Sequence, residues 1–385
     1  MISIFLSSCG GGGGVGGTGI ILSSSGKVSN TFGQNLNKDI DGDGDLDAAV
    51  VLNGVLYNSP VEEASYSITT DGTYIYITGE TQNPFNNLYD AIDTNGNTSA
   101  SWIDDRVTPN LNNGGLSIAA DNNGNFYITG FRGTTGSSVD AFVIKFDTNG
   151  GVQTSFGTNG EVIIDIFGDY DYGQSITTDN SRVYVAGYSW NGSNEDAFVV
   201  KLNSSNGTFD TTFGSNGKLI LQNIAGTNVD EEARSITISN NNIFITGWCH
   251  NGNNWDSFVA KISNSGSLDP NFGNNGIVLI KNIAGLNLDD EAEDIEIDNS
   301  NGKIYITGGA TNSNNNWDAF VVRLNPNGSI DTTFGNNGKV VINDVAGTNV
   351  NDDSNSIVLN PLGIYITGST HNGNNYDAFV IRIDY

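Results

Sequence analysis

Five aspartates alternate with other residues along one short segment near the start of the sequence. The segment reads Asp39-Ile40-Asp41-Gly42-Asp43-Gly44-Asp45-Leu46-Asp47, so carboxylates stand at positions 1, 3, 5, 7 and 9 and a glycine at position 6. Calcium binds about six to eight oxygen atoms in a flexible loop, and alternating aspartates around a sharp glycine turn can supply them. The spacing therefore predicts a Ca²⁺ site made of Asp39, Asp41, Asp43, Asp45 and Asp47.

This segment does not match an EF-hand, because position 12 is Val50 and not glutamate. The stretch that begins at Phe32-Gly33 instead resembles an FG-GAP blade, as in integrin α propellers. The resemblance implies side-chain ligands from Asp39, Asp41, Asp43 and Asp47, and a backbone carbonyl ligand from Asp45. Without a cation these carboxylates repel one another, so we expect calcium binding to be coupled to folding. The competing interpretation is a solvated acidic turn.

A second segment carries a candidate modification site at Cys9. Leu6-Ser7-Ser8-Cys9 resembles a bacterial lipobox, in which a leucine and two small residues precede the acylated cysteine. The glycine-rich stretch that follows, up to residue 19, is typical of a flexible tether. Only eight residues precede Cys9 and none is basic, whereas a signal peptide has a basic start and an apolar stretch of about 7–15 residues. We therefore expect the natural start to lie upstream; the alternative is a chance match.

The overall composition argues against some classes of partner. The chain has 385 residues and a net charge of −28, which repels a phosphate backbone, so we expect no nucleic acid partner. No segment approaches the roughly 18 apolar residues of a membrane-spanning helix, so membrane contact would depend on the lipid anchor. The two cysteines, Cys9 and Cys249, do not indicate a disulfide framework, and we expect Cys249 to be a small core residue.

The strongest pattern in the sequence is an internal repeat of about 60 residues. A short apolar segment ends in glycine six times, with the glycines 51, 57, 60, 61 and 60 residues apart: Gly79, Gly130, Gly187, Gly247, Gly308 and Gly368. Each repeat has four strand-length runs, which in the fifth repeat are 292–298, 303–308, 318–324 and 339–343. A four-stranded antiparallel unit cannot bury both faces alone, but a ring of such units can. We therefore predict an all-β fold, a six-bladed β-propeller over residues 20–385.

A longer motif connects these repeats to a known family. The run from Asp318-Ala319-Phe320 to Asp331-Thr332-Thr333-Phe334-Gly335 resembles the delta-60 repeats of β-propellers. The resemblance is close over residues 115–385 and loose over 60–110. It implies a propeller fold and a location outside the cytoplasm, but no reaction. We therefore expect the protein on the outer surface or in the periplasm of a bacterial cell envelope, or secreted.

The last repeat ends after its third strand, at 377–384, so a fourth strand is missing there. Phe32-Gly33 matches the Phe-Gly turn that precedes the fourth strand in other repeats, and residues 47–54 form an apolar run. We predict that this N-terminal strand joins the last blade and closes the ring. The domain boundaries are then an anchor and tether at 1–19, the closure strand and calcium loop at 20–60, and the repeats at 61–385.

The loops most suited to ligand binding share one predicted face of the propeller. Those that lead into the first strands are acidic, and those between the second and third strands carry amides, aromatic rings and histidines. Such side chains suit sugar stacking or protein contacts. The candidate ligand-binding residues are Trp190, His250, Trp255, Trp317, His371 and Tyr376. For Trp255, Trp317 and Tyr376, which occupy one equivalent position, packing is the competing interpretation.

The next position along each of these repeats is an aspartate. We expect these four aspartates to cap turns by accepting hydrogen bonds from backbone N–H groups: Asp196, Asp256, Asp318 and Asp377.

The sequence favours binding over catalysis. Its two histidines, His250 and His371, come without an evident serine and aspartate partner, so we predict no catalytic residue. The rival is a calcium-dependent, lactonase-like propeller hydrolase with an ion in the channel. In this chain, the aligned positions of the first strands that would line the channel are five serines and one aspartate, which would hold an ion poorly: Ser67, Ser117, Ser175, Ser235, Asp294 and Ser356. We therefore expect a monomeric, lipid-anchored binding, adhesion or scaffold propeller that recognises a protein or glycan surface.

Overall fold

The structure is a computed structural model that describes most of the repeat region. It covers 63–70, 74–82, 85–93 and 98–103, and then 113–385 except for 134–137, 286, 347 and 372–375. Cys9 and the calcium segment Asp39–Asp47 lie outside the described residues. Within these ranges, no helix is long and apolar enough to cross a membrane.

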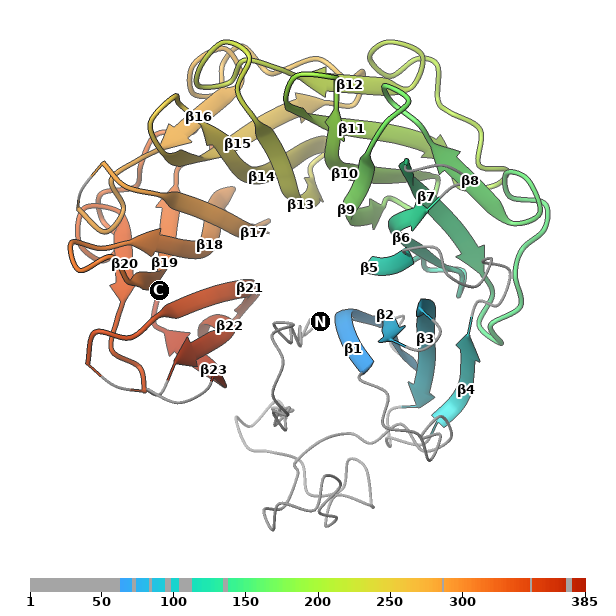
Figure 1. Cartoon of the computed structure of the whole chain (residues 1–385), viewed down its shortest axis with the longest axis horizontal. Coiled ribbons are helices and arrows are strands. Elements are labelled where there is room, and N and C mark those ends of the chain that lie inside the picture. The colour runs from blue at the N-terminus through green and yellow to red at the C-terminus, as the bar shows by residue number, and fades with distance from the viewer. Residues whose placement is uncertain are drawn as a thin grey trace.

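The described strands form six antiparallel sheets around a common centre (Figure 1). The first two sheets are β1 (Glu63–Thr70), β2 (Tyr74–Gln82), β3 (Phe85–Asp93) and β4 (Thr98–Ile103), then β5 (Asn113–Ala120), β6 (Phe126–Gly133), β7 (Val139–Phe146) and β8 (Glu161–Ile164). The next two are β9 (Asp171–Thr178), β10 (Arg182–Trp190), β11 (Glu195–Asn203) and β12 (Lys218–Leu221), then β13 (Glu231–Ser239), β14 (Asn242–His250), β15 (Trp255–Ser263) and β16 (Ile277–Ile280). The last two are β17 (Asp290–Asp298), β18 (Lys303–Thr311), β19 (Trp317–Leu324) and β20 (Lys339–Ile342), then β21 (Asp352–Asn360), β22 (Gly363–His371) and β23 (Tyr376–Ile383).

The prediction of an all-β fold with four-stranded antiparallel sheets is confirmed. In every sheet the strands follow sequence order, with the first strand innermost (Figure 1). Neighbouring inner strands contact one another in turn from β1 to β21. In each sheet, the inner strand begins at one end, and the loop between the second and third strands lies at that same end. We call it the entry end. The opposite end carries the Phe-Gly turns and is called the Phe-Gly end.

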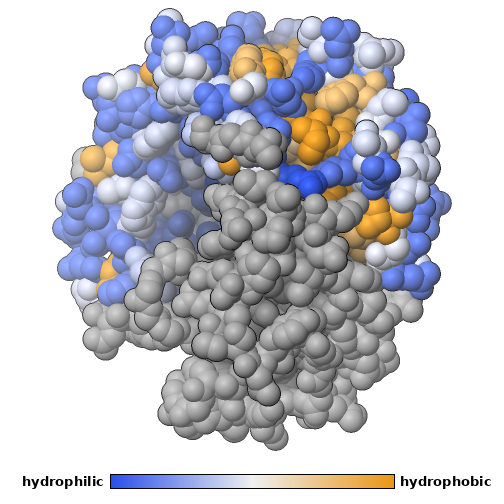
Figure 2. Space-filling view, turned by 45° about the vertical axis from the view of Figure 1, so that its right-hand side comes forward, coloured by the Kyte–Doolittle hydropathy of each residue, from blue (hydrophilic) through white to orange (hydrophobic). Residues whose placement is uncertain are grey.

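The core lies between adjacent sheets, because each sheet buries both of its faces against its neighbours. One cluster joins Ala186 and Phe213 of the β9–β12 repeat to Ile236, Ile245 and other residues of the next sheet. The strands are rich in isoleucine, valine and phenylalanine, which suit such doubly buried sheets. On the side in view in Figure 2, hydrophobic residues form separate patches among hydrophilic ones. Burial between sheets is therefore what holds successive repeats together.

The repeated Phe-Gly turn also joins adjacent sheets through the backbone. Phe213 is fully buried, and Gly214 has a φ of +50° that favours glycine. The amide of Gly214 donates a 2.8 Å hydrogen bond to the carbonyl of Ser265 in the next repeat. Two further turns make the same bond, at 2.9 Å each: Gly157 to Asn206 and Gly273 to Asn327. The motif thus fixes the spacing between neighbouring sheets.

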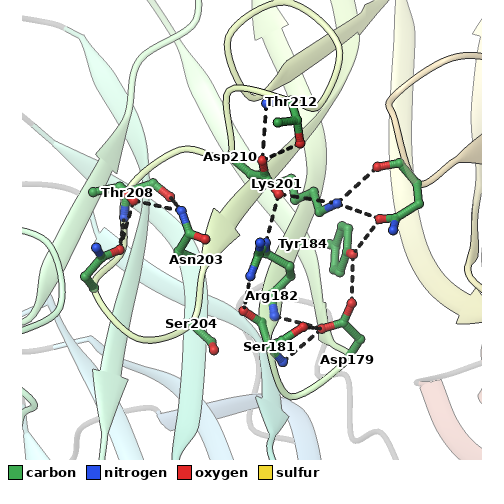
Figure 3. A network of polar contacts seen from close by, with 12 residues as sticks. Asp179, Ser181, Arg182, Tyr184, Lys201, Asn203, Ser204, Thr208, Asp210 and Thr212 are labelled. Carbon is green, nitrogen blue, oxygen red and sulfur yellow. Dashed lines mark hydrogen bonds and ion pairs between the residues drawn. The ribbon is translucent and has the colours of Figure 1, made fainter.

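The aspartate of the Asp-Thr-Thr-Phe-Gly motif anchors this turn (Figure 3). Asp210 accepts hydrogen bonds from Thr212 Oγ1 at 2.6 Å and from Arg182 Nε at 2.8 Å. These two donors hold the pKa of Asp210 well below its usual range. Asp331 is held in the same way by Lys303 and Thr333, which lower its pKa. The charges of this motif therefore serve the fold at the Phe-Gly end.

The glycine that marks each repeat is required by a β-bulge in the inner strand. In β13 the pairing shifts between Ala233 and Ser235, opposite Gly247 and Thr246 of β14. A Cβ added to Gly247 would lie 1.9 Å from the carbonyl oxygen of Glu232. At four further repeats the distance is 1.8 or 1.9 Å: Gly130, Gly187, Gly308 and Gly368. The repeated glycine in the sequence is thus the steric consequence of the bulge.

The variant Gly247→Ala is expected to destabilise the fold by at least about 2 kcal/mol, because the backbone must open to admit the methyl group. Urea unfolding measures the difference. The control is Gly226→Ala in a loop, where the nearest atom to the new Cβ is Val229 Cγ2 at 3.3 Å, and where we expect a cost within about 1 kcal/mol. Equal unfolding midpoints for the two variants would show that the close approach at Gly247 relaxes freely.

Candidate functional site

The aligned serines of the inner strands are used for contacts between sheets. The hydroxyl oxygen of Ser117 accepts a 3.2 Å hydrogen bond from the amide of Ile176 in the next inner strand. Two other pairs repeat this contact at 3.2 Å: Ser67 with Ile118, and Ser175 with Ile236. These three serines therefore have a structural role.

Asp294 replaces the serine in β17 and connects three inner strands. Its carboxylate accepts hydrogen bonds from Ser235 Oγ at 2.7 Å, Ser356 Oγ at 3.0 Å and the amide of Ile357 at 2.9 Å. The amide of Ile295 donates a further bond at 2.9 Å. Burial raises the pKa of Asp294, and the four donors stabilise its charge. Asp294 is thus a satisfied connecting residue of the inner ring of strands.

The residue one position before each aligned serine is the extra residue of the β-bulge. A bulge turns a side chain away from the regular alternation and is common beside functional sites. The position after the bulge is serine in five of six repeats, but the bulged residues all differ in type. They are Tyr66, Leu116, Gln174, Arg234, Glu293 and Asn355. Such variation within a regular repeat favours recognition over packing.

Two of these bulged residues, Arg234 and Glu293, meet between adjacent sheets. Arg234 Nε lies 3.4 Å from Glu293 Oε2, and Arg234 Nη1 lies 3.7 Å from Glu232 Oε2. The guanidinium carbon of Arg234 lies 4.6 Å from the ring centroid of Trp248, a stacked cation–π contact. The side chains of Arg234 and Glu293 keep 25% and 21% of their surface exposed.

Further carboxylates lie beside this pair, on the next two inner strands. Glu291 stands opposite Gly309 in the strand pairing. A Cβ added to Gly309 would lie 2.6 Å from Asp353 Oδ1 and 2.7 Å from Trp317 Cε3. The absence of a side chain therefore lets the Trp317 indole approach Asp353. Asp353 Oδ1 is shielded from solvent and has no hydrogen-bond partner among the described residues.

We call Glu232, Arg234, Glu291, Glu293 and Asp353 the axial cluster. Burial is the main cause that raises the pKa of Glu291 to about 8, and the charges of Glu293, Asp289 and Asp353 add to it. Burial also raises the pKa of Asp353 to about 7, again with a contribution from Glu293. The axial cluster thus contains four carboxyl groups and one cationic side chain.

Aromatic rings continue this layer across the preceding sheets. Phe131 lies 5.2 Å from Tyr172, and Tyr172 lies 5.1 Å from Tyr188, measured between ring centroids. Tyr188 and Trp248 occupy equivalent positions in β10 and β14, each paired with the second residue of its inner strand. The entry end therefore has an aromatic part and an acidic part that meet at Arg234. Charged groups beside ring faces are typical of ligand sites.

The variant Glu291→Gln is expected to raise the melting temperature at pH 8.5 and to leave it almost unchanged at pH 4.5. The folded chain holds the proton of Glu291 up to about pH 8, whereas the ordinary value is 4.5. The unfolded chain therefore loses this proton first, and stability falls as the pH rises between these two values. Glutamine removes that loss. Thermal unfolding across this pH range measures it.

The matched control for this experiment is Asp269→Asn at the Phe-Gly end. Lys261 Nζ lies 2.9 Å from Asp269, and this bond lowers the pKa of Asp269. Stability from a lowered carboxyl pKa is present at high pH and lost in acid, so this variant is expected to lower the melting temperature at pH 8.5. A decrease for Glu291→Gln as well would contradict the assignment of Glu291 as an unfavourably buried carboxyl group.

The six aromatic and histidine candidates lie at the entry end, but the structure gathers them only in part. His250 and Trp255 pack edge to face with centroids 5.1 Å apart, and His371 and Tyr376 do so at 5.0 Å. Trp190 ends β10, where its amide donates to the carbonyl of Tyr170. Each pair thus belongs to its own hairpin. Trp317 borders the axial cluster, because its ring and Asp353 Oδ1 both lie beside Gly309.

The expectation that the following aspartates accept backbone N–H groups is wrong for three of them. Side-chain nitrogens donate instead: Asn191 and Gln222 to Asp196, Asn251 and Lys281 to Asp256, and Asn312 to Asp318. The reason is that the loop amides are already bound by the asparagine oxygens, as Ser193 is by Asn191 Oδ1 at 2.9 Å. These aspartates hold the loop asparagines in place.

The acidic loops expected on this face include Glu232, Glu291 and Asp353, but Arg234 and Glu293 were missed in the sequence because alternation alone cannot show a bulge. The signal in the sequence was the residue just before each aligned serine. The repeats are otherwise regular, but this residue is of a different type in all six. Among the described residues, no group of three or more histidine, cysteine, aspartate or glutamate side chains is arranged to hold a metal ion. Cys249 is buried and has a free thiol, as expected for a core residue.

A comparison with protein families agrees with this architecture. Residues 180–213, 238–272 and 300–334 match the family described as "Domain of unknown function (DUF5122) beta-propeller". These segments are β-propeller repeats. Each match covers the second and third strands of a blade and ends at its Phe-Gly turn. The sheets of this chain are therefore called blades below.

Solved structures with a related arrangement share little sequence with the chain. A protein of unknown function from Dyadobacter fermentans is 10% identical, with a TM-score of 0.49 over 84% of this chain and 99% of that chain. A glucose dehydrogenase is 10% identical, with a TM-score of 0.46 over 85% of this chain and 100% of that chain. At this level of similarity we draw nothing from either protein about activity. No curated protein matches the sequence.

Proposed function

We propose that this chain is a binding propeller of the bacterial cell envelope that holds a glycan at the entry end of its blades. The observation that carries the proposal is Arg234, which stacks on Trp248 between the carboxylates of Glu232 and Glu293. Carboxylates and a planar guanidinium hydrogen-bond sugar hydroxyls, and aromatic faces stack on sugar rings. The recognition surface is the axial cluster with the neighbouring Trp317.

The remaining parts of the proposal concern how the propeller is closed and held. We propose six blades, with a strand from residues 20–60 as the fourth strand of the last blade and a Ca²⁺ ion bound by the Asp39–Asp47 segment. Acylation at Cys9 would anchor a monomer, and the glycine-rich stretch would separate it from the membrane. In the described part of the chain the last sheet has three strands, β21–β23, whereas the sheet before it has four. That difference supports the closure.

A glycan array with the labelled full chain tests the proposed function. The double variant Arg234→Gln with Glu293→Gln removes the central pair and keeps the net charge. We expect it to lower binding at least tenfold, or about 1.4 kcal/mol. The control variant Lys261→Gln with Asp269→Asn removes an ion pair of 2.9 Å at the Phe-Gly end and should bind like the natural chain. Unchanged binding by the first variant, or no bound glycan at all, would contradict the proposal.

A further inference from the structure

We infer that the ligand of the axial cluster carries an ammonium group, and that the glycan is therefore an amino sugar. This inference rests on the proposed function and deepens it. Three observations carry it: an excess of carboxylates, an acceptor atom without a donor, and the spread of these groups over several blades.

The first observation is the charge of the site. Glu232 and Glu293 lie 3.7 and 3.4 Å from the guanidinium of Arg234, and the charge of Glu293 contributes to the raised pKa values of Glu291 and Asp353. Glu195, at the start of β11, adds a fifth carboxyl group and is hydrogen-bonded to Glu232. Burial and the neighbouring carboxyl groups disfavour the charged form, so Glu291 and Asp353, whose pKa values are raised to about 8 and 7, hold their protons below neutral pH. A neutral sugar would leave these groups protonated, whereas an ammonium group would favour their charged form.

The second observation is the position of Asp353 Oδ1. This atom is shielded from solvent, accepts no hydrogen bond from the described residues and lies beside Gly309, next to the Trp317 ring. At the position of Gly309, the preceding blades carry the bulky side chains Phe131, Tyr188 and Trp248. An ammonium group has three N–H donors for carboxylate oxygens and is also attracted to an indole face. Asp353 and Trp317 supply both partners.

The third observation separates an organic cation from a metal ion. Four of the carboxyl groups come from three successive inner strands, β13, β17 and β21, and the fifth, Glu195, comes from β11. In the ranges that the structure covers, they do not converge as a group that could hold a metal. Spread acceptors next to aromatic rings instead fit an extended ligand with rings, hydroxyls and amines. Together with the proposed function, this indicates an oligosaccharide of amino sugars.

Calorimetry with two matched oligosaccharides tests the inference. Glucosamine tetramer and its N-acetylated counterpart share rings and hydroxyls, but only the first carries ammonium groups at pH 6.5. We expect the full chain to bind the glucosamine tetramer at least tenfold more tightly. Binding should also release protons, seen as different heats in two buffers, because the ammonium replaces protons on Glu291 and Asp353.

Two variants separate recognition from general attraction to an acidic protein. Asp353→Asn should weaken binding of the glucosamine tetramer about tenfold, while Asp269→Asn, which removes the same charge at the Phe-Gly end, should not. Equal affinity for the two tetramers would overturn the ammonium inference and leave a glycan-binding propeller. Equal weakening by both variants would also overturn it, because the attraction would then be nonspecific. If the array shows no bound glycan at all, the proposed function itself fails.

Discussion

Removal of residues 1–60 is expected to lower the melting temperature of the whole propeller by roughly 10 °C or more. The physical reason lies in β23, the last described strand. Asp377 and Ala378 are exposed there, whereas the equivalent Asp318 and Ala319 of β19 are buried beside β20. An uncovered edge strand leaves backbone groups and apolar side chains in water. Because a ring loses its closure as a unit, all blades should unfold earlier.

Circular dichroism during heating measures this effect on chains that begin at residues 1, 20 and 61. The chain from residue 20 lacks only the anchor and tether, so it should melt with the full chain. The chain from residue 61 should melt earlier in one transition. Equal melting of all three chains would show that the described blades are stable without an N-terminal strand.

Chelation of calcium is expected to lower the melting temperature of the full chain by about 5–10 °C. A ligand at a hundred times its dissociation constant stabilises the folded state by about 2.7 kcal/mol, and unbound aspartates in the segment from Asp39 to Asp47 would repel one another. The double variant Asp41→Asn with Asp43→Asn should melt at the lower temperature with or without calcium. Thermal unfolding in millimolar calcium and in excess chelator provides the comparison.

The control for the calcium experiment is Asp165→Asn with Asp169→Asn, which removes two acidic charges from a loop between blades. This variant should keep the full response to calcium. A response that both double variants lose equally would indicate general screening of the acidic surface. If the natural chain shows no response at all, calcium binding at this segment is wrong.

The fold could largely be predicted from the sequence, because a strand pattern that is uncertain in one repeat recurs in the others. In the fifth repeat, the runs 303–308 and 318–324 correspond to β18 (Lys303–Thr311) and β19 (Trp317–Leu324). The glycines of the repeat were also read correctly as markers of the second strand. Their cause, a carbonyl oxygen that leaves no room for a Cβ, could not be read, because it depends on the pairing of two strands.

The candidate site was harder to predict from the sequence, because it too depends on how two strands pair. A bulge inserts one residue into the alternation, so Arg234 and Glu293 have no regular place in a two-residue period. Trp317 was selected for its exposed aromatic type, but its partner Asp353 comes from another repeat, 36 residues later. The pairs His250 with Trp255 and His371 with Tyr376 were accessible, since each spans one hairpin.

The most direct measurement is a crystal structure of the full chain with the best glycan from the array. The account predicts that the sugar contacts Glu293 and Asp353 and stacks on Trp317 at the entry end. A glycan bound at the Phe-Gly end, or only at the His250 and Trp255 hairpin, would contradict the assignment of the axial cluster as the binding site.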